Sequence, residues 1–218
     1  MKISAEYRSV ARDRLKNNWG TSILVCVIVA IISSAMSIIP MCGWILSLLF
    51  VGQFIVGELI YFTKLHRKQE TSLGNLFEGF GQNWISNCLT YLLQELYTIL
   101  WTLLFVIPGI VKHYAYSMTM YLKSQKPQLG HNEAITLSQK IMQGKKWKLF
   151  CLHLSFIGWI ILSIFTCGIG FIFLLPYMQA SIIAFYEDAY TEYRTITGEI
   201  VDIEEDATTE ETEIQIEE

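Results

Sequence analysis

Five polar or charged side chains interrupt the long apolar runs of this 218-residue sequence, and they are its candidates for chemistry. They are Glu58, Glu95, Lys112, His153 and Gln179. Carboxylate, imidazole and amide groups can together hold a proton or a cation. Ionisable residues inside apolar helices usually face the interior of a bundle, because contact with lipid is costly for them. The sequence therefore predicts an interior polar site.

Glu95 supports two interpretations. It lies eleven residues after Trp84, about 16 Å along a helix that crosses an apolar layer of about 30 Å, and so near the middle of that layer. A charged carboxylate there costs on the order of 2.5–3.5 kcal/mol on insertion scales, which favours its protonated form. Structurally, a protonated Glu95 could tie helices together through Gln94 or a tyrosine. Functionally, it could be a proton or cation site on one path with Glu58 and His153.

The remaining interior candidates lie nearer to the expected ends of their helices. Glu58, His153 and Gln179 fall six to eight residues from the predicted cytoplasmic boundary, or roughly 9–12 Å along a helix. They could meet in one cluster if their helices are neighbours. Lys112 lies three residues beyond a predicted outer turn and is expected to snorkel to outer headgroups or to a turn carbonyl. The alternative is a cation that guards an outer entrance.

The apolar runs that carry these residues are long enough to cross a lipid bilayer. The sequence is 52% hydrophobic and 17% charged, whereas soluble domains are about 25% charged. Between Lys16 and Lys64 the only charged side chain is Glu58, and residues 149–186 have none. Each run exceeds the ~20 apolar residues needed for one crossing. The sequence therefore predicts an all-α polytopic membrane protein.

A repeated pattern divides the apolar part into three hairpins. A polar pair followed by tryptophan recurs at Trp19, Trp84 and Trp147, and each tryptophan precedes an apolar hairpin that turns 21 to 24 residues later. The pattern predicts about six membrane helices, in hairpins at residues 21–63, 84–123 and 148–188. The second arm of the middle hairpin is short and could cross fully or only in part. The expected turns are Pro40-Met41-Cys42-Gly43, Pro108-Gly109 and Thr166-Cys167-Gly168.

Three amphipathic stretches precede the hairpins, at residues 3–16, 71–82 and 130–143, and are predicted to be cytoplasmic. In the first, Tyr7, Ala11 and Leu15 recur at helical spacing beside a row of basic residues. Two interpretations are equally open for it. It is either a helix that lies in the membrane surface or a cytosolic helix that packs on the protein itself. The third stretch is predicted to stop at Gly144.

Charge separates the chain into a basic body and an acidic tail. Residues 199–218 hold ten acidic groups and no basic one, which leaves an excess of six positive charges on residues 1–198. We expect residues 1–198 to form the membrane domain and the tail to be disordered. Lys and Arg gather at the N-terminus, in the long connections and after the last crossing, so both termini are predicted to be cytoplasmic.

Motifs for familiar chemistries are missing from the sequence. It has no GxxxxGK[ST], HExxH, GxSxG or EF-hand pattern, so no enzyme activity or cofactor is predicted. Its four histidines show no paired metal spacing and its five cysteines form no CxxC pair. These patterns argue against a metal centre and a disulfide framework. The predicted partners are the lipid bilayer and other membrane proteins or lipid headgroups, with no nucleic acid.

Several short motifs resemble those of one known family. They are Leu76-Phe77-Glu78-Gly79-Phe80, Ile107-Pro108-Gly109-Ile110-Val111-Lys112, Tyr114-Ala115-Tyr116-Ser117-Met118, Met142-Gln143-Gly144-Lys145-Lys146, Leu154-Ser155-Phe156-Ile157-Gly158-Trp159 and Pro176-Tyr177. Over roughly residues 1–190 the chain resembles the bacterial integral membrane family numbered 975 among domains of unknown function. The resemblance implies a bacterial plasma membrane location and no assigned activity. More loosely, the hairpin plan is similar to the membrane domain attached to some glycerophosphodiester phosphodiesterases, but no catalytic domain accompanies it here.

Two classes of function follow from these patterns. The preferred class is a structural or interaction protein, whose amphipathic stretches and acidic tail engage other membrane proteins or lipid headgroups. The alternative is a small transporter or channel component that uses the interior polar residues. Intramembrane charges are few, and a discontinuous-helix binding pattern is limited to Pro108-Gly109, which favours the first class.

Overall fold

The computed structural model describes residues 3–16, 18–38, 42–81, 84–166 and 168–198, and all regular structure in these ranges is helical. The elements are α1 (Ser4–Leu15), α2 (Trp19–Ile38), α3 (Cys42–His66), the 3-10 helix η1 (Leu73–Phe80), α4 (Trp84–Leu104), α5 (Val106–Tyr116), α6 (Thr119–Gln125), α7 (His131–Ile141), α8 (Lys146–Leu154), α9 (Ile157–Phe165) and α10 (Ile169–Thr197). Outside the described residues lie the acidic tail, Pro40 and Met41, Cys167, and the polar residues Asn17, Gln82 and Asn83.

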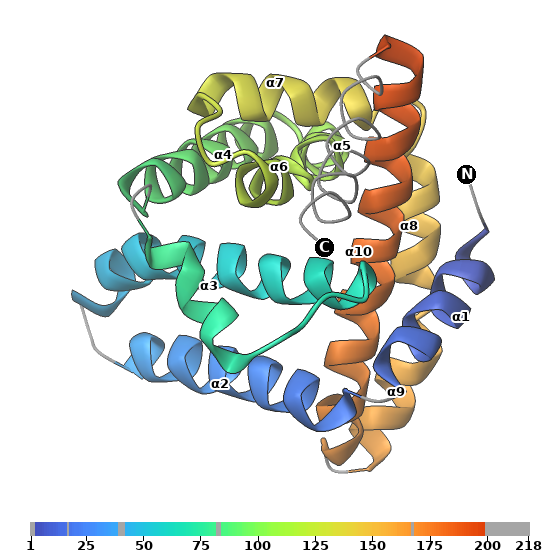
Figure 1. The fold of residues 1–218 in the computed structure, drawn as a ribbon. Helices are drawn as coiled ribbons and strands as arrows, with labels where there is room; N and C mark the ends of the chain where they lie inside the picture. The colour runs from blue at the N-terminus through green and yellow to red at the C-terminus, as the bar shows by residue number, and fades with distance from the viewer. Residues whose placement is uncertain (1–2, 17, 39–41, 82–83, 167, 199–218) are drawn as a thin grey trace, which may run out of the picture.

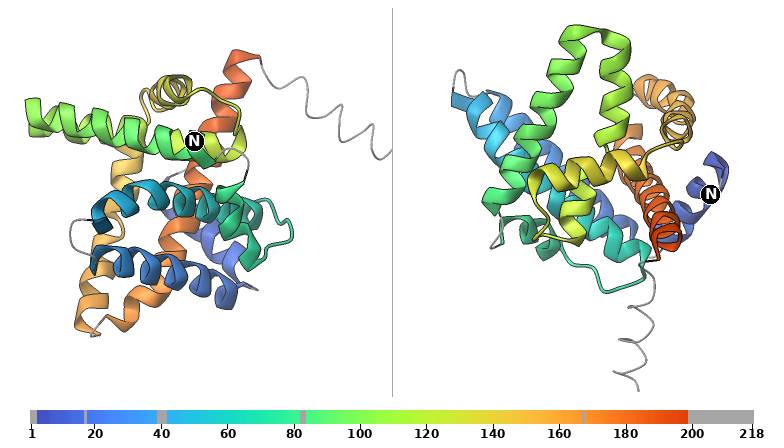
Figure 2. Two further views of the ribbon diagram at one scale, coloured as in Figure 1. Left: turned by 90° about the vertical axis from the view of Figure 1, so that its left-hand side faces the viewer. Right: turned by 90° about the horizontal axis from the view of Figure 1, so that it is seen from above.

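The helices pair into hairpins that point in different directions. α2 packs on α3, α4 on α5, and α9 on α10. In Figure 1, α10 runs from top to bottom of the molecule, whereas α2 and α3 run across it. The right-hand view of Figure 2 shows the α4–α5 pair projecting away from the other helices. The predicted all-α class is confirmed, but six crossings in one common direction are not.

Two helical segments within the described residues have the length and hydropathy of a membrane crossing. They are Lys146–Phe165, which comprises α8 and α9, and Ile169–Thr197. Ser4–Leu15 together with Trp19–Ser34 would make a third, but this pair is bent by 105°. α5 has eleven residues, about 16 Å of helix, which is too short for a core of about 30 Å. The structure thus supports two to three candidate crossings.

The tips of two hairpins expose large apolar side chains. At the α4–α5 turn, Leu103, Phe105 and Ile107 are 83%, 67% and 76% exposed. At the α9–α10 turn, Phe165 and Ile169 are 81% and 64% exposed. Contiguous apolar surface of this kind is unfavourable in water and marks a surface that contacts lipid or protein.

α1 packs along α10, as the second of its two interpretations requires. Tyr7, Ala11 and Leu15 are buried in the main core. The Tyr7 ring meets the Phe185 ring edge-on with centroids 5.5 Å apart, and its hydroxyl donates a hydrogen bond to Asp188 Oδ2 at 3.1 Å. The first amphipathic stretch therefore packs on the protein itself.

The second amphipathic stretch, η1, lies so close to α3 that two contact points require glycine. A Cβ atom on Gly57 would overlap the backbone of Leu76, and a Cβ atom on Gly79 would overlap the carbonyl of Gln53. Leu76 is fully buried at this contact. The close approach fixes η1 along the part of α3 that leads to Glu58.

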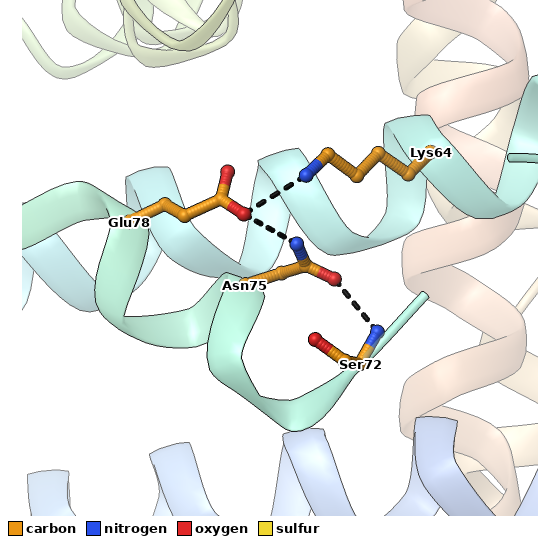
Figure 3. A network of polar contacts seen from close by, with 4 residues as sticks. All are labelled: Lys64, Ser72, Asn75 and Glu78. Carbon is orange, nitrogen blue, oxygen red and sulfur yellow. Dashed lines mark hydrogen bonds and ion pairs between the residues drawn. The ribbon is translucent and has the colours of Figure 1, made fainter. Parts of the chain in front are cut away.

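A polar network holds the outer surface of η1 (Figure 3). Lys64 Nζ lies 2.8 Å from Glu78 Oε1, and the Asn75 side-chain amide donates to the same carboxylate oxygen. The Asn75 carbonyl oxygen accepts a hydrogen bond from the backbone N–H of Ser72 at 2.8 Å. One carboxylate thus links α3 to the start of η1.

The central turn lies at Phe105, and the predicted turn at Pro108-Gly109 is wrong. α4 ends at Leu104, and α5 begins one residue beyond Phe105. Pro108 sits in the first turn of α5, where its missing N–H breaks no helical hydrogen bond. Gly109 serves close helix approach, because a Cβ atom there would overlap Thr102. The proline and glycine therefore shape the second arm after the reversal.

The third amphipathic stretch forms α7, which covers α4, α5 and α6. Its buried face includes the predicted Ala134 and Ile141, and Ser138 Oγ donates to the carbonyl of Ala115 at 2.8 Å. Gly144 follows with φ 71°, a left-handed conformation that favours glycine after a helix. The helix itself ends at Ile141, shortly before the predicted stop at Gly144.

Lys123, at the end of the predicted middle hairpin, is completely buried. Its Nζ donates to Ser86 Oγ at 2.7 Å, to the Pro127 carbonyl at 3.0 Å and to the Leu129 carbonyl at 2.7 Å. These three bonds satisfy the three donors of the ammonium group. Lys123 therefore ties α6 to α4 and to the loop before α7.

Candidate functional site

A cavity of about 390 Å³ that opens to the surface lies among α3, α4, α5, α6, α8 and α10. Four of the five predicted site residues line it, and each comes from a different helix: Glu58, Glu95, His153 and Gln179. The helices that carry them are separated by long stretches of sequence. The packing of α3 on α4 and α10, and of α5 on α4 and α8, is what brings these residues to one place. We call this space the acidic cavity.

The Glu58 carboxyl group occupies the corner of the acidic cavity nearest α2. Cys26 Sγ lies 3.8 Å from Glu58 Oε1, at the distance of a weak thiol hydrogen bond. The side-chain amide of Gln179 also hydrogen-bonds this carboxyl group. Glu58 is thus held from α2 and from α10. Two of the sequence-predicted candidates, Glu58 and Gln179, are direct partners.

Glu95 lines the same cavity without such partners. Within the described part of the chain, no hydrogen bond or ion pair holds its carboxyl group. The nearby Tyr91 interacts with it electrostatically. The expected structural role, with a protonated Glu95 bonded to Gln94 or a tyrosine, therefore has no contact to support it among these residues. A carboxyl group in this state is available to a ligand.

Two histidines flank one tyrosine in the cavity wall. The Tyr114 ring centroid lies 5.9 Å from that of His113 and 5.8 Å from that of His153. Sequence reasoning missed His113, because no paired metal spacing marks it and the contact with His153 exists only between helices. It also missed the role of Gln94, which lines the cavity and whose buried Oε1 has no hydrogen-bond partner among the described residues.

Lys112 lies away from the acidic cavity. Its Nζ is 3.4 Å from Gln139 Oε1 and sits 4.8 Å from the Trp101 ring centroid and 5.9 Å from that of Tyr116. Its contacts within the protein are thus an amide of α7 and two aromatic faces, with no turn carbonyl among the described residues, and the expected contact with headgroups stays a prediction. The contact with Gln139 brings Lys112 next to α7. The sequence predicts a cytoplasmic α7 and an outer Lys112, and these two predictions are not compatible with this contact.

Family membership can be stated from sequence comparison. A family model described as "Protein of unknown function (DUF975)" matches residues 1–112 and 103–192. The chain belongs to this family. No curated protein and no solved structure matches it. The looser resemblance to phosphodiesterase membrane domains stays a prediction.

The acidic cavity gives this DUF975 chain a defined chemistry. Two carboxyl groups, two imidazoles and two amides share walls that are apolar or aromatic apart from Ser117. No three His, Cys, Asp or Glu side chains in the described ranges are grouped closely enough to hold a metal ion. Carboxylates between apolar walls are stabilised by a proton or by a bound cation. The arrangement suits reversible binding of protons or of a small cationic solute.

Proposed function

We propose that this chain is a bacterial plasma membrane protein that binds protons or a small cationic solute in the acidic cavity, as a small transporter or channel component. The observation that carries the proposal is the meeting of Glu58 and Glu95, from two different helices, in one cavity. Their separation in sequence means that the fold had to bring them together. A carboxyl group without a partner is unfavourable in an apolar wall unless it is protonated or binds a ligand.

Insertion into a membrane supports this assignment. Two to three elements have the length and hydropathy of a crossing, and the exposed apolar tips of α4–α5 and α9–α10 suit contact with lipid tails. The distribution of Lys and Arg favours cytoplasmic termini. α4–α5 enters the membrane only in part, since α5 is too short to cross it.

Orientation is open to a labelling test. A single-cysteine variant that retains Cys151 should react with a membrane-impermeant maleimide when the reagent is added from the cytoplasmic side. Cys88 is a poor reporter because it is buried. Cys42 and Cys167 were expected near the outer face; the side chain of Cys42 and all of Cys167 lie outside the described structure. Labelling of Cys151 from outside only would contradict cytoplasmic termini.

In the proposed mechanism, protons and cations compete for the two carboxyl groups. Hydrogen bonds from Gln179 and Cys26 hold the Glu58 carboxyl group in place, so it provides a fixed ligand in the cavity wall. Glu95 is free to exchange its proton for a cation. His113 and His153 can pass a proton along the wall, because imidazole both donates and accepts hydrogen bonds.

The test is flux through proteoliposomes that contain the full chain and a pH-sensitive dye. An imposed membrane potential should drive proton or monovalent cation movement faster than in protein-free liposomes. Glu95→Gln, which keeps shape but cannot ionise, should abolish most of this flux. Glu70→Gln is the matched control, since Glu70 is exposed in a loop. A wild-type flux no greater than that of empty liposomes would reject the proposal.

An interaction role remains the second candidate, favoured by exposed apolar residues on one amphipathic segment, η1, and at the start of α8. Phe77 on η1 and Trp147 on α8 are both exposed. Against it, α1, η1 and α7 already use their main apolar faces inside the protein. Capture of a membrane partner that is lost in Phe77→Ser but kept in Glu95→Gln would favour this role.

A further inference from the structure

A second cavity, of about 470 Å³, lies between α1 and the α9–α10 hairpin. Its α10 wall includes Phe173 and Tyr177, whereas the acidic cavity is lined by Gln179 and Tyr186. At 3.6 residues per turn these two pairs lie on opposite faces of α10. The second cavity is therefore a separate site. We call it the basic cavity, because Arg8 and Arg12 line it.

The charge of the basic cavity is uncompensated. Among the residues that the structure describes, no acidic side chain lines it. Asp13, the acid next to Arg12, pairs with Lys16 at 2.8 Å, with both groups in solvent. The Nε atom of Arg8 is buried and has no hydrogen-bond partner among the described residues. Two guanidinium groups, one of them with a buried unused donor, call for an anion that can accept several hydrogen bonds.

The rest of the basic cavity is apolar and opens beside lipid-facing surface. The Trp19 ring packs on Phe173 with centroids 6.3 Å apart, and Trp159 forms the opposite side. Two of the hydroxyls in the wall are already used, because Ser163 Oγ donates to the Trp159 carbonyl and Thr166 Oγ1 to the Ser163 carbonyl. The charged groups of the described wall are confined to the arginine end.

We propose that the basic cavity binds one acidic phospholipid. The phosphate lies between Arg8 and Arg12, and an acyl chain lies along Trp19, Trp159 and Phe173. A soluble anion would leave the aromatic walls without a partner, and a neutral hydrophobic solute would leave the guanidinium groups without one. Arginine matches phosphate through paired hydrogen bonds, and tryptophan is favoured at the level of lipid headgroups. The site would couple α1 to the α9–α10 hairpin through a bound lipid.

The experiment is native mass spectrometry of the full chain, delipidated in a neutral detergent. Dioleoylphosphatidylglycerol and dioleoylphosphatidylcholine are added in separate titrations. We expect one phosphatidylglycerol per chain, held roughly tenfold more tightly than phosphatidylcholine. The double variant R8Q/R12Q should lower phosphatidylglycerol retention about tenfold. Arg14→Gln is the matched control, because Arg14 lies on the same helix and does not line the cavity.

A second pair of variants tests the cavity without changing its charge. Ala5 lines the basic cavity and is exposed, so Ala5→Phe should fill the entrance, leave the fold intact and reduce retention about as much as R8Q/R12Q. Ser9→Phe, on an exposed position of α1 outside the cavity, should bind like the wild type. This pair keeps the test decisive if R8Q/R12Q fails to fold.

Three results would overturn the proposal. One is equal retention of the two lipids by the wild-type chain. Another is an equal loss in Arg14→Gln, which would indicate general charge attraction. The third is displacement of the lipid by millimolar inorganic phosphate, which would indicate a site for free phosphate.

Discussion

The acidic and basic cavities lie on opposite faces of α10 and are built in different ways. Each wall of the acidic cavity comes from a different helix, and its polar groups are isolated in apolar sequence. The basic cavity takes both of its charges from α1, a helix whose charge pattern looks like that of any amphipathic surface helix. One site is marked by residues that stand out in the sequence. The other exists only because α1 bends back along α10.

The strongest test of this comparison measures both flux and lipid retention in a variant of each cavity. Glu95→Gln should remove most cation or proton flux, by tenfold or more if the carboxyl group is the binding site, and leave phosphatidylglycerol retention unchanged. R8Q/R12Q should do the reverse. Flux in proteoliposomes and native mass spectrometry measure the two effects on the same preparations. Loss of both properties in either variant would show that the cavities are one coupled site.

Gly57→Ala should cause the largest loss of stability. A Cβ atom there overlaps the backbone of Leu76, so η1 must move from α3, and overpacking of this kind costs about 3 kcal/mol. Because Gly57 precedes Glu58, flux should also fall. Unfolding in mixed detergent micelles measures the stability. Gly20→Ala is the control, since nothing lies within 4 Å of a Cβ atom at Gly20. Equal stability of the two variants would refute the close contact.

Sequence reasoning found the residues of the acidic cavity better than it found the architecture around them. Glu58, Glu95, His153 and Gln179 can be found from the sequence because polar groups are rare in apolar runs. This signal does not depend on how the helices pack. The turn was misplaced from Phe105 to Pro108 because proline and glycine signal a reversal by sequence alone. In the fold Pro108 lies in the first turn of α5, and Gly109 allows the close approach of Thr102.

Hairpin directions and the basic cavity were beyond sequence reasoning for a different reason. Apolar periodicity predicts that α2 and α10 bury a face, but it does not specify the angle at which α2 crosses α10. The 105° bend between α1 and α2 follows from contacts such as Tyr7 with Phe185, which join residues far apart in the chain. Lys123 was missed likewise, since a lysine after an apolar run normally marks a boundary.

Lys123→Met should destabilise the fold by about 2 kcal/mol. Ser86 and two backbone carbonyls would lose the group that satisfies them, and buried acceptors without partners cost about 1–3 kcal/mol. α6 lies outside the proposed crossings, and burial there lowers the pKa of Lys123 from its ordinary value. The same unfolding assay applies. Lys126→Met, at an exposed position, should change little; equal losses would refute the buried network.

Tyr7→Phe should have a smaller effect that distinguishes the two cavities. It removes the hydrogen bond to Asp188, worth about 1 kcal/mol, and keeps the ring contact with Phe185. α1 should hold its place less firmly, so lipid retention should fall by a few fold while flux through the acidic cavity stays unchanged. Tyr193→Phe is the matched change on α10. A fall in flux without a change in lipid retention would contradict the assignment of α1 to the basic cavity.

Lys112→Met should have the smallest effect, and it tests where the acidic cavity ends. The variant loses a 3.4 Å contact with Gln139 and two cation–π contacts, which are worth about 0.5–1 kcal/mol at partly exposed sites. The methionine side chain retains much of the apolar packing on Trp101, so the protein should insert and remain stable. Flux should equal that of the wild type, because Lys112 does not line the acidic cavity, although its neighbour His113 does. A strong loss of flux in a stable Lys112→Met protein would place this cation on the conducting path and extend the site from the cavity towards α7. Failed insertion would instead indicate that Lys112 neutralises a buried acidic group, and the cation–π contacts would not explain its position.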